Sequence, residues 1–459
     1  MHSRRHATSF VALMVGALVV ALAGTSPASG VSAGLNQVVS ANPADTTPHV
    51  LNGTVRAIAE VGGIVYVGGT FTTVKNAPST APQQTRRYLF AFNPTAPAGS
   101  QIVSTFNPQL DGVVESIAPA PAGSGGAIIV GGRFRTVGGT AQRSLAMLTT
   151  TGARVTGFNA RTNGTVDKVL VRGNRVLAGG NFGTAGGSGG NVARVDLADF
   201  NLSGSTAALG NLNLPVTEGR ILNNGNQTSP SVQEMDANSA GTRLVVIGNF
   251  RRVGGQLRQQ IAMIDLTNNT VAPWSTNRYP NDRPGTPMDF PCADSFHTNL
   301  RDVEISPDGN WFVVVTTGAA VRNSLCDTAA RWEMNAAPNA NPTWINCTGG
   351  DTLWSVAVTN AAVYVGGHQR WHNNCDGRDS AGPGAVERSG IAALSPTIGS
   401  NNFTSVPGSV LSWNPGKERG VGVEELVATS RGLYVGSDTR LIGTPREVRP
   451  RLAFFPANG

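Results

Sequence analysis

One short phrase returns seven times along this chain, and it most often reads two apolar residues, Val-Gly-Gly, any residue and Phe. The spacings between successive copies are 63, 48, 69, 68, 50 and 70 residues. The clear copies lie at residues 64–71, 128–134, 176–182 and 245–250, and the weaker ones at 312–318, 363–368 and 433–438. Self-similarity at such a period indicates a repeat architecture, in which each copy is one supersecondary unit. The repeat therefore constrains the fold more than any single residue does.

Each unit of the repeat reads as four short strands. The first strand opens with an apolar residue, and a Gly-containing tight turn leads into the repeated phrase, which is apolar throughout and forms the second strand. A third strand follows a recurrent Arg, and a fourth ends in an aromatic residue before Asn-Pro. No long stretch after the leader has the 3.6-residue periodicity of a helix. We therefore predict an all-β fold, a seven-bladed β-propeller of four-stranded antiparallel blades.

The two ends of the chain complement each other. Residues 452–456 form a third strand that has no fourth, and residues 38–43 carry the pattern of the missing strand. We expect the N-terminal segment to pair with the C-terminal segment, which would close the ring and leave no free sheet edge. Residues 34–459 are then a single propeller domain.

The repeat resembles that of the delta-60 repeat family of secreted bacterial β-propellers. The matching residues are Val67, Gly68, Gly69, Thr70 and Phe71 with Val74; Val130 to Phe134 with Val137, Gly138 and Gly139; and Ile247 to Phe250 with Val253, Gly254 and Gly255. The resemblance covers essentially the whole chain after the leader, and it is loosest in the fifth and last units. It implies the propeller fold and does not imply a shared reaction.

Residues 1–33 have the features of a signal peptide. The pair Arg4-Arg5 precedes an apolar run at residues 10–23, which is too short for a comfortable membrane span. Cleavage after Ala33 fits the small–x–small rule, and cleavage after Ala28 is the alternative. The arginine pair leaves twin-arginine export open beside the general secretory route, which we favour. With no later run of about 18 apolar residues, we expect a secreted protein without a membrane span.

Cysteine usage agrees with export. The chain has four cysteines, an even number that allows three pairings. Cys292 and Cys326 flank the fifth copy of the phrase, and Cys347 and Cys375 flank the sixth. We therefore predict the disulfides Cys292–Cys326 and Cys347–Cys375, with free buried thiols as the alternative. A zinc site has less support, because no CxxC pair is present.

Charge and motifs exclude several classes of function. The formal net charge is only +7, and no run of five basic residues occurs, so nucleic-acid binding has little support. No Gly-x-Ser-x-Gly or Ser-x-x-Lys signature is present. A glycosidase with paired carboxylates stays open, because such acids come from distant blades. Glu424 and Glu425 are adjacent, and neighbours on a strand should point to opposite faces.

The first strand of each unit should line the central channel of the propeller. The residue after its opening apolar residue gives a column: Arg56, Glu115, Asp167, Gln233, Arg301, Trp354 and Glu424. Six of the seven are polar or charged, as channel-facing residues should be. One interpretation is an axial site for a cation or polar ligand, with Glu115, Asp167 and Glu424 as oxygen ligands. The other is a solvated ring of mixed sign. A structural Ca²⁺ ion is compatible with these oxygens, but the sequence does not indicate one, so we expect no cofactor.

A second candidate group lies in the fifth and sixth units, near the cysteines. It comprises His297, His368 and Trp371, together with Asp294, His372 and Asp376. Such a mixture suits a glycan, which stacks on aromatic faces and hydrogen-bonds to polar side chains. It equally suits two long insertions held by disulfides without any ligand. A recurrent arginine, by contrast, should make a structural bond between neighbouring units; its copies are Arg87, Arg143, Arg258, Arg388 and Arg449.

Together these features predict a secreted, monomeric binding or scaffold module for a glycan, a cell-wall polymer or a protein. The alternative is a polysaccharide hydrolase or lyase with its site at the channel mouth. A purely structural surface protein is the third hypothesis.

Overall fold

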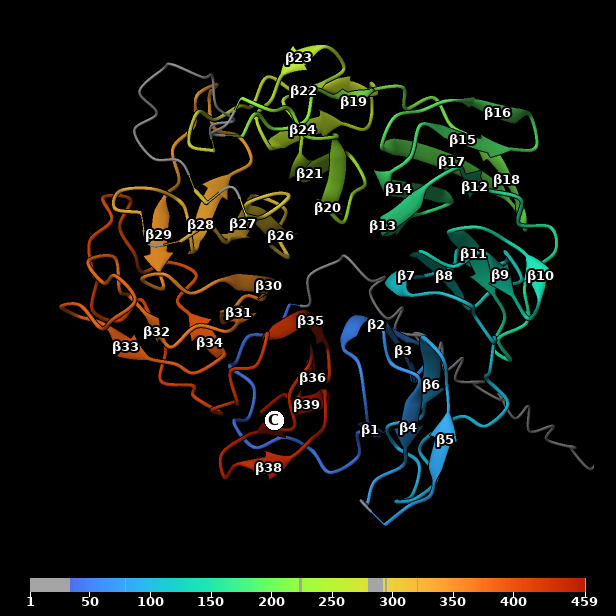
Figure 1. Ribbon diagram of the computed structural model, residues 1–459, viewed down its shortest axis with the longest axis horizontal. Helices are drawn as coiled ribbons and strands as arrows, with labels where there is room; N and C mark the ends of the chain where they lie inside the picture. Colours follow the sequence, from blue (N-terminus) through green and yellow to red (C-terminus); the bar gives the residue numbers. More distant parts are fainter. Residues whose placement is uncertain are drawn as a thin grey trace, which may run out of the picture.

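The computed structural model describes residues 34–78, 80–222, 225–279, 292–293, 295–319 and 321–458. The predicted signal peptide at 1–33 therefore lies outside the described residues. Across the described ranges the regular elements are β-strands, and seven sheets stand around a central axis as blades (Figure 1). Each sheet is antiparallel and begins with its strand nearest the axis.

The strands occupy the same places in every blade, here counted 1 to 7 in chain order. The innermost strands are β2 (Val55–Val61), β7 (Val114–Pro119), β13 (Thr165–Arg172), β20 (Ser231–Ala237), β26 (Leu300–Ile305), β30 (Leu353–Val358) and β35 (Val423–Thr429). The second strands, which carry the repeated phrase, are β3 (Ile64–Gly69), β8 (Ile128–Gly132), β14 (Arg175–Asn181), β21 (Arg243–Asn249), β27 (Trp311–Thr316), β31 (Val363–Gly367) and β36 (Gly432–Ser437). The third strands are β6 (Leu89–Phe92), β11 (Leu145–Leu148), β17 (Leu197–Ser203), β24 (Ile261–Asp265), β28 (Thr328–Glu333), β34 (Ile391–Leu394) and β39 (Leu452–Pro456).

The fourth strand is the most variable part of a blade. It is a full strand in blades 3 to 5, as β18 (Thr206–Leu209), β25 (Thr270–Val271) and β29 (Trp344–Cys347). In blades 1, 2 and 6 it is reduced to isolated bridges, Phe92 to Ile102, Leu148 to Arg154 and Leu394 to Val410. The outer edge of the ring is thus less regular than the sequence predicts.

Small hairpins between the second and third strands were not predicted from the sequence. They are β4 (Thr73–Lys75) with β5 (Gln83–Thr85), β9 (Thr136–Val137) with β10 (Thr140–Ala141), β15 (Thr184–Gly187) with β16 (Gly190–Ala193), β22 (Arg252–Val253) with β23 (Gln256–Leu257), β32 (Trp371–His372) with β33 (Val386–Glu387), and β37 (Leu441–Ile442) with β38 (Glu447–Val448). Short strands that precede blades 1, 3 and 4 join them: β1 (His49–Val50), β12 (Arg161–Thr162) and β19 (Val216–Thr217). Because the second strand runs antiparallel to the first, every hairpin lies at the end where its inner strand begins. We call this side of the ring the hairpin face.

The two glycines of the repeated phrase have separate steric reasons. A Cβ atom on Gly68 would lie 2.6 Å from Cγ1 of Val114, which opens the inner strand of the next blade. A Cβ atom on Gly69 would lie 2.0 Å from the carbonyl oxygen of Thr54. The first glycine therefore lets neighbouring blades approach, and the second lets two strands of one blade approach.

The hydrophobic core consists of seven clusters, each shared by two neighbouring blades. One of them joins the last blade to the first, with Tyr434 and Leu452 packed against Val55 and Phe71. Figure 1 shows the same junction, where β2 lies beside β35. The blades therefore form a closed ring.

The N-terminal segment takes the place of the fourth strand in blade 7. The N–H of Ala44 donates to the carbonyl oxygen of Phe454 at 2.8 Å, and Ser40 donates to Pro456 at 2.9 Å. In blade 6, Leu411 makes the corresponding bond to Ala393. The pairing of the two ends is thus present, although residues 38–43 are not a regular strand.

The prediction that the recurrent arginine bonds a neighbouring unit is wrong. Arg258, Arg388 and Arg449 each donate to the carbonyl of the preceding residue and to a carbonyl at the outer edge of the same blade. In blade 1 the residue that does so is Arg86 and not Arg87, and in blade 2 Gln142 and not Arg143 takes the position. The position is set by a left-handed residue two places later, Tyr88, Ser144, Gln260, Gly390 or Arg451. The bond is therefore within a blade and not between neighbours.

Both predicted disulfides are present. Cys292 and Cys326 have Cα atoms 5.6 Å apart, and Cys347 and Cys375 have Cα atoms 4.8 Å apart. Among the described residues there is no helix of the length and apolarity needed to cross a membrane. Structural disulfides are typical of proteins that fold in an oxidising compartment.

Candidate binding site at the mouth of the central channel

A β-bulge at the second or third residue of every inner strand builds the channel mouth. In β2, for example, Val55 pairs with Gly69 and Ala57 pairs with Gly68, so Arg56 is the additional residue. The same shift occurs in β7, β13, β20, β26, β30 and β35. The seven bulged residues are Arg56, Glu115, Asp167, Gln233, Arg301, Trp354 and Glu424, and all of them line one cavity of about 210 Å³. The sequence-derived column is therefore brought together, while its role in ligand binding remains a prediction.

The bulge also overturns one expectation about the acidic residues. Glu424 and Glu425 line the same cavity, although neighbours on a regular strand would point to opposite faces. At a bulge two consecutive residues face one partner residue, so the local kink aims both side chains inward. Glu234 and Asp302 reach the cavity in the same way.

Half of the ring is an ion-paired arc, which we define as Glu424, Arg56, Glu115, Arg133 and Asp167. The guanidinium of Arg56 forms ion pairs with the carboxylates of Glu424, at 3.0 Å, and Glu115, at 3.1 Å. Arg133 bonds Glu115 at 2.8 Å and lies 3.7 Å from Asp167. Burial, and secondly the charge of Glu115, raises the pKa of Asp167 to about 7, against the opposing effect of both arginines. Because these carboxylates already form ion pairs with arginines, they are poorly placed as ligands for Ca²⁺.

Sequence reasoning missed Arg133. It occupies the variable position of the second Val-Gly-Gly-x-Phe phrase, directly after the strand that pairs with β7. That position follows the two glycines and lies beside the bulge, so a charged residue there could have been added to the column.

The other half of the ring is an open arc, which we define as Gln233, Arg301 and Trp354. The guanidinium carbon of Arg301 lies 4.6 Å from the ring centre of Trp354 and 4.9 Å from that of Phe296. No carboxylate among the described residues forms an ion pair with Arg301, and its Nε is buried without a hydrogen-bond partner there. Burial, and secondly the nearby charge of Arg220, lowers the pKa of Arg301 to about 10, against the opposing charge of Asp327.

A second polar level lies deeper in the channel, around a cavity of about 80 Å³. Lys168 bonds Glu234 at 2.8 Å and also faces Asp302 and Glu425. Burial raises the pKa of Glu234 and Glu425, although Lys168 opposes the shift in both. Asp302 accepts the N–H of Val356 in the next blade at 2.8 Å. This level therefore joins neighbouring blades through polar contacts.

The second candidate group does not form one site. His297 contacts Ser231 at 3.0 Å, and the ring of Trp371 lies 4.4 Å from the guanidinium carbon of Arg370. His372 is fully buried beside Asn346, and Asp376 pairs with Arg322 on the surface. Asp294 lies outside the described residues. Within the described ranges no three His, Cys, Asp or Glu side chains are arranged to hold a metal ion.

His368 nevertheless belongs to the channel mouth through its neighbours. Its Nδ1 lies 3.3 Å from the carbonyl oxygen of Val421, and Nε1 of Trp354 donates to the same oxygen at 2.8 Å. The N–H of Thr352 donates to Nε2 of His368 at 3.3 Å. Since Nε2 is the acceptor, Nδ1 carries the proton and donates to Val421. The histidine thus positions the loop that holds Trp354.

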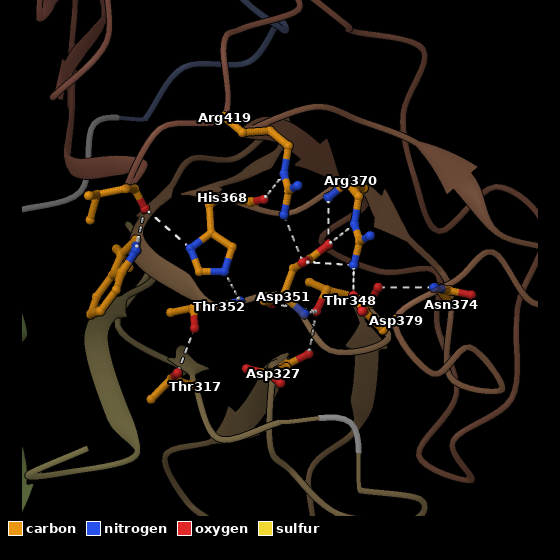
Figure 2. A network of polar contacts seen from close by, with 12 residues as sticks. Thr317, Asp327, Thr348, Asp351, Thr352, His368, Arg370, Asn374, Asp379 and Arg419 are labelled. Carbon is orange, nitrogen blue, oxygen red and sulfur yellow. Dashed lines mark hydrogen bonds and ion pairs between the residues drawn. The ribbon is translucent and has the colours of Figure 1, made fainter. Parts of the chain in front are cut away.

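A buried carboxylate fixes that same loop (Figure 2). Asp351 accepts the backbone N–H and the Nε of Arg370, both at 2.9 Å, and the Nη2 of Arg419 at 3.1 Å. Arg419 in turn donates to the carbonyl oxygen of His368 at 2.8 Å. The network connects three parts of blades 6 and 7 next to Val421, so Trp354 rests on a rigid support.

The fold resembles those of solved structures. The chain has an all-β propeller fold. The WD40 repeats of RRP9 match it with 10% sequence identity over 91% of this chain and 99% of that chain, at a TM-score of 0.44. The structure of U3-55K matches it with 10% identity over 90% of this chain and 99% of that chain, at a TM-score of 0.46. At this identity the likeness concerns the fold alone.

Comparison at the sequence level adds no relative: no protein-family model and no curated protein matches the chain. The relation to the delta-60 repeat family therefore stays a prediction.

Proposed function

We propose that this protein is a secreted binding module that holds an extracellular glycan at the channel mouth on its hairpin face. The observation that carries the proposal is the open arc. It offers a half-buried indole, an amide and a guanidinium that forms no ion pair with an acid of the described residues, at the edge of a 210 Å³ cavity. Aromatic faces with a few fixed polar groups are the usual composition of a saccharide site.

The carboxyl groups that line the cavity are engaged in ion pairs and hydrogen bonds, which favours binding over hydrolysis. A glycosidase needs two carboxyl groups free to act on opposite sides of one bond. Glu115 and Glu424 are both bonded to Arg56, and Asp302 accepts backbone N–H groups. Of the other acids that line the cavity, Glu234 pairs with Lys168 at 2.8 Å, Asp167 lies 3.7 Å from Arg133, and Glu425 accepts the backbone N–H of Ile58.

A purely structural role is disfavoured by the same arginine. Keeping a largely desolvated cation without an ion pair among the described residues is costly, and a structural protein would gain stability from an apolar residue at that position. Secretion is supported by the leader pattern of residues 1–33 and by two disulfides, which are typical of exported proteins.

A glycan array probed with the exported protein tests the proposal. Trp354→Ala should weaken binding to the recognised glycans by about 10-fold, because the stacking surface is lost. Leu257→Ala is the control, since Leu257 is an exposed apolar residue on the outer strand β23 and its removal should leave binding unchanged. Absence of any glycan binding, or equal binding by both variants, would overturn the proposal. Release of new sugar ends from a bound glycan would favour the enzyme instead.

A further inference from the structure

The charges at the channel mouth are distributed unevenly. Each arginine of the ion-paired arc, Arg56 and Arg133, contacts two carboxylates. Arg301 has no such contact among the described residues, and the bulged residues on either side of it, Gln233 and Trp354, are uncharged. One side of the cavity therefore presents an arginine that makes no ion pair among the described residues, with the charge of Asp327 acting on it from nearby.

The surroundings of Arg301 leave its hydrogen-bond donors available. Phe296 and Trp354 cover the guanidinium, with ring centres 4.9 Å and 4.6 Å from its central carbon. Stacked rings hold a guanidinium by its faces, whereas its N–H groups point outward in the plane. The position of Trp354 is itself fixed by its bond to Val421. The arginine is thus held in one orientation before any ligand arrives.

Charges of both signs act on Arg301. The buried guanidinium of Arg220 lowers the pKa of Arg301, whereas the charge of Asp327 opposes this shift. The acids of the deeper level, Glu234 and Asp302, oppose the entry of a multiply charged anion into the channel. A single planar carboxylate can accept two N–H groups of the guanidinium while it stays at the edge of the cavity.

We infer that Arg301 recognises the carboxylate of an acidic glycan, so that the ligand of this site is a saccharide containing uronic acid units. The inference rests on the proposed function and adds the chemical class of the ligand. The sugar ring lies against the aromatic rim at Trp354, and its carboxylate accepts two N–H groups of Arg301. The amide of Gln233 is the neighbouring partner for a hydroxyl group.

Matched pairs of oligosaccharides test the inference. Galacturonate, glucuronate and mannuronate oligomers are compared with their methyl esters in titration calorimetry on the full exported protein. The acids should bind about 10-fold to 100-fold more tightly than the esters, as expected for charge-assisted hydrogen bonds. Arg301→Gln should abolish this preference, and Arg301→Lys should reduce it, because lysine keeps the charge and loses the fork.

The control is Arg446→Gln, which removes an exposed arginine from the loop between β37 and β38 and should keep the preference. Equal binding of acids and esters, or an Arg301→Gln variant that still prefers acids, would overturn the inference and leave the proposed function standing. Absence of binding to every oligosaccharide in the experiments, neutral glycans included, would overturn both.

Discussion

Lys168 faces three acids, Glu234, Asp302 and Glu425, at the deeper level of the channel, and its removal should destabilise the protein in a pH-dependent way. Lys168→Met keeps the length of the side chain and deletes its charge. In the unchanged protein the amine of Lys168 lies 2.8 Å from the carboxylate of Glu234. In the variant Glu234 faces Asp302 and Glu425 without a counterion. Removing one partner of a buried ion pair typically costs about 3–5 kcal/mol.

The sign of the pH dependence follows from the raised pKa values. Burial already raises the pKa of Glu234 and Glu425 above that of an unfolded glutamate, about 4.3. Loss of Lys168 raises both further. A carboxyl group with a raised folded pKa stabilises the native state below its unfolded pKa, and this contribution is lost as pH rises through the folded pKa. The deficit of the variant should therefore be below about 1 kcal/mol at pH 5 and reach about 3–5 kcal/mol at pH 8.5.

Guanidinium denaturation of both proteins at the two pH values, followed by tryptophan fluorescence, measures the deficit. Arg135→Met is the control: it deletes an exposed cation next to the outer strand β9 and should show little difference between the two pH values. An equal deficit at pH 5 and pH 8.5, or a larger one at pH 5, would refute the account of a buried acidic level balanced by one amine.

Two further changes test the construction of the ring. Ala44→Pro removes the N–H that bonds Phe454 and should lower stability by about 1–3 kcal/mol in thermal denaturation. Ala44→Gly keeps the N–H and should cost less than about 1 kcal/mol, so equal losses would show that this bond does not seal the ring. Gly68→Val should destabilise by more than about 2 kcal/mol, because its Cβ would lie 2.6 Å from Val114, and adding Val114→Ala should restore part of the loss. Additive effects of the two substitutions would contradict direct contact between the blades.

The strands of the blades and the channel-facing residues could be predicted from the sequence, because each copy of the repeat is recognised within a short stretch of chain. The opening apolar residue of each inner strand marks where the bulge follows, so the next residue could be assigned to the channel seven times. The same periodicity, together with the cysteines that flank two copies, was sufficient to pair both disulfides. Each of these predictions depends on a short stretch of chain.

Predictions that depend on geometry between strands were less successful. Alternation along a strand separates Glu424 from Glu425, and only the bulge, which is a property of two strands together, brings them to one cavity. Arg86 and Arg87 are equivalent in composition, and the left-handed backbone at Tyr88 decides which of them crosses to the fourth strand. The histidines of the fifth and sixth units are close in sequence but bond to different loops. Arg301 stacks on Phe296 and on Trp354, which belongs to the next blade. The spacing of these residues in the sequence does not predict that contact.

The bond between Arg449 and Ala44 spans 405 positions of the chain, which has a consequence for the order of folding. The residues that complete blade 7 leave the ribosome well before their partner strand. Joining ends that far apart costs about 5 kcal/mol of chain entropy. The final sheet consequently forms late, and until then its third strand presents an open edge on which a second chain could pair. A short peptide copying residues 38–47 would compete for that edge during refolding and reveal how long it stays open.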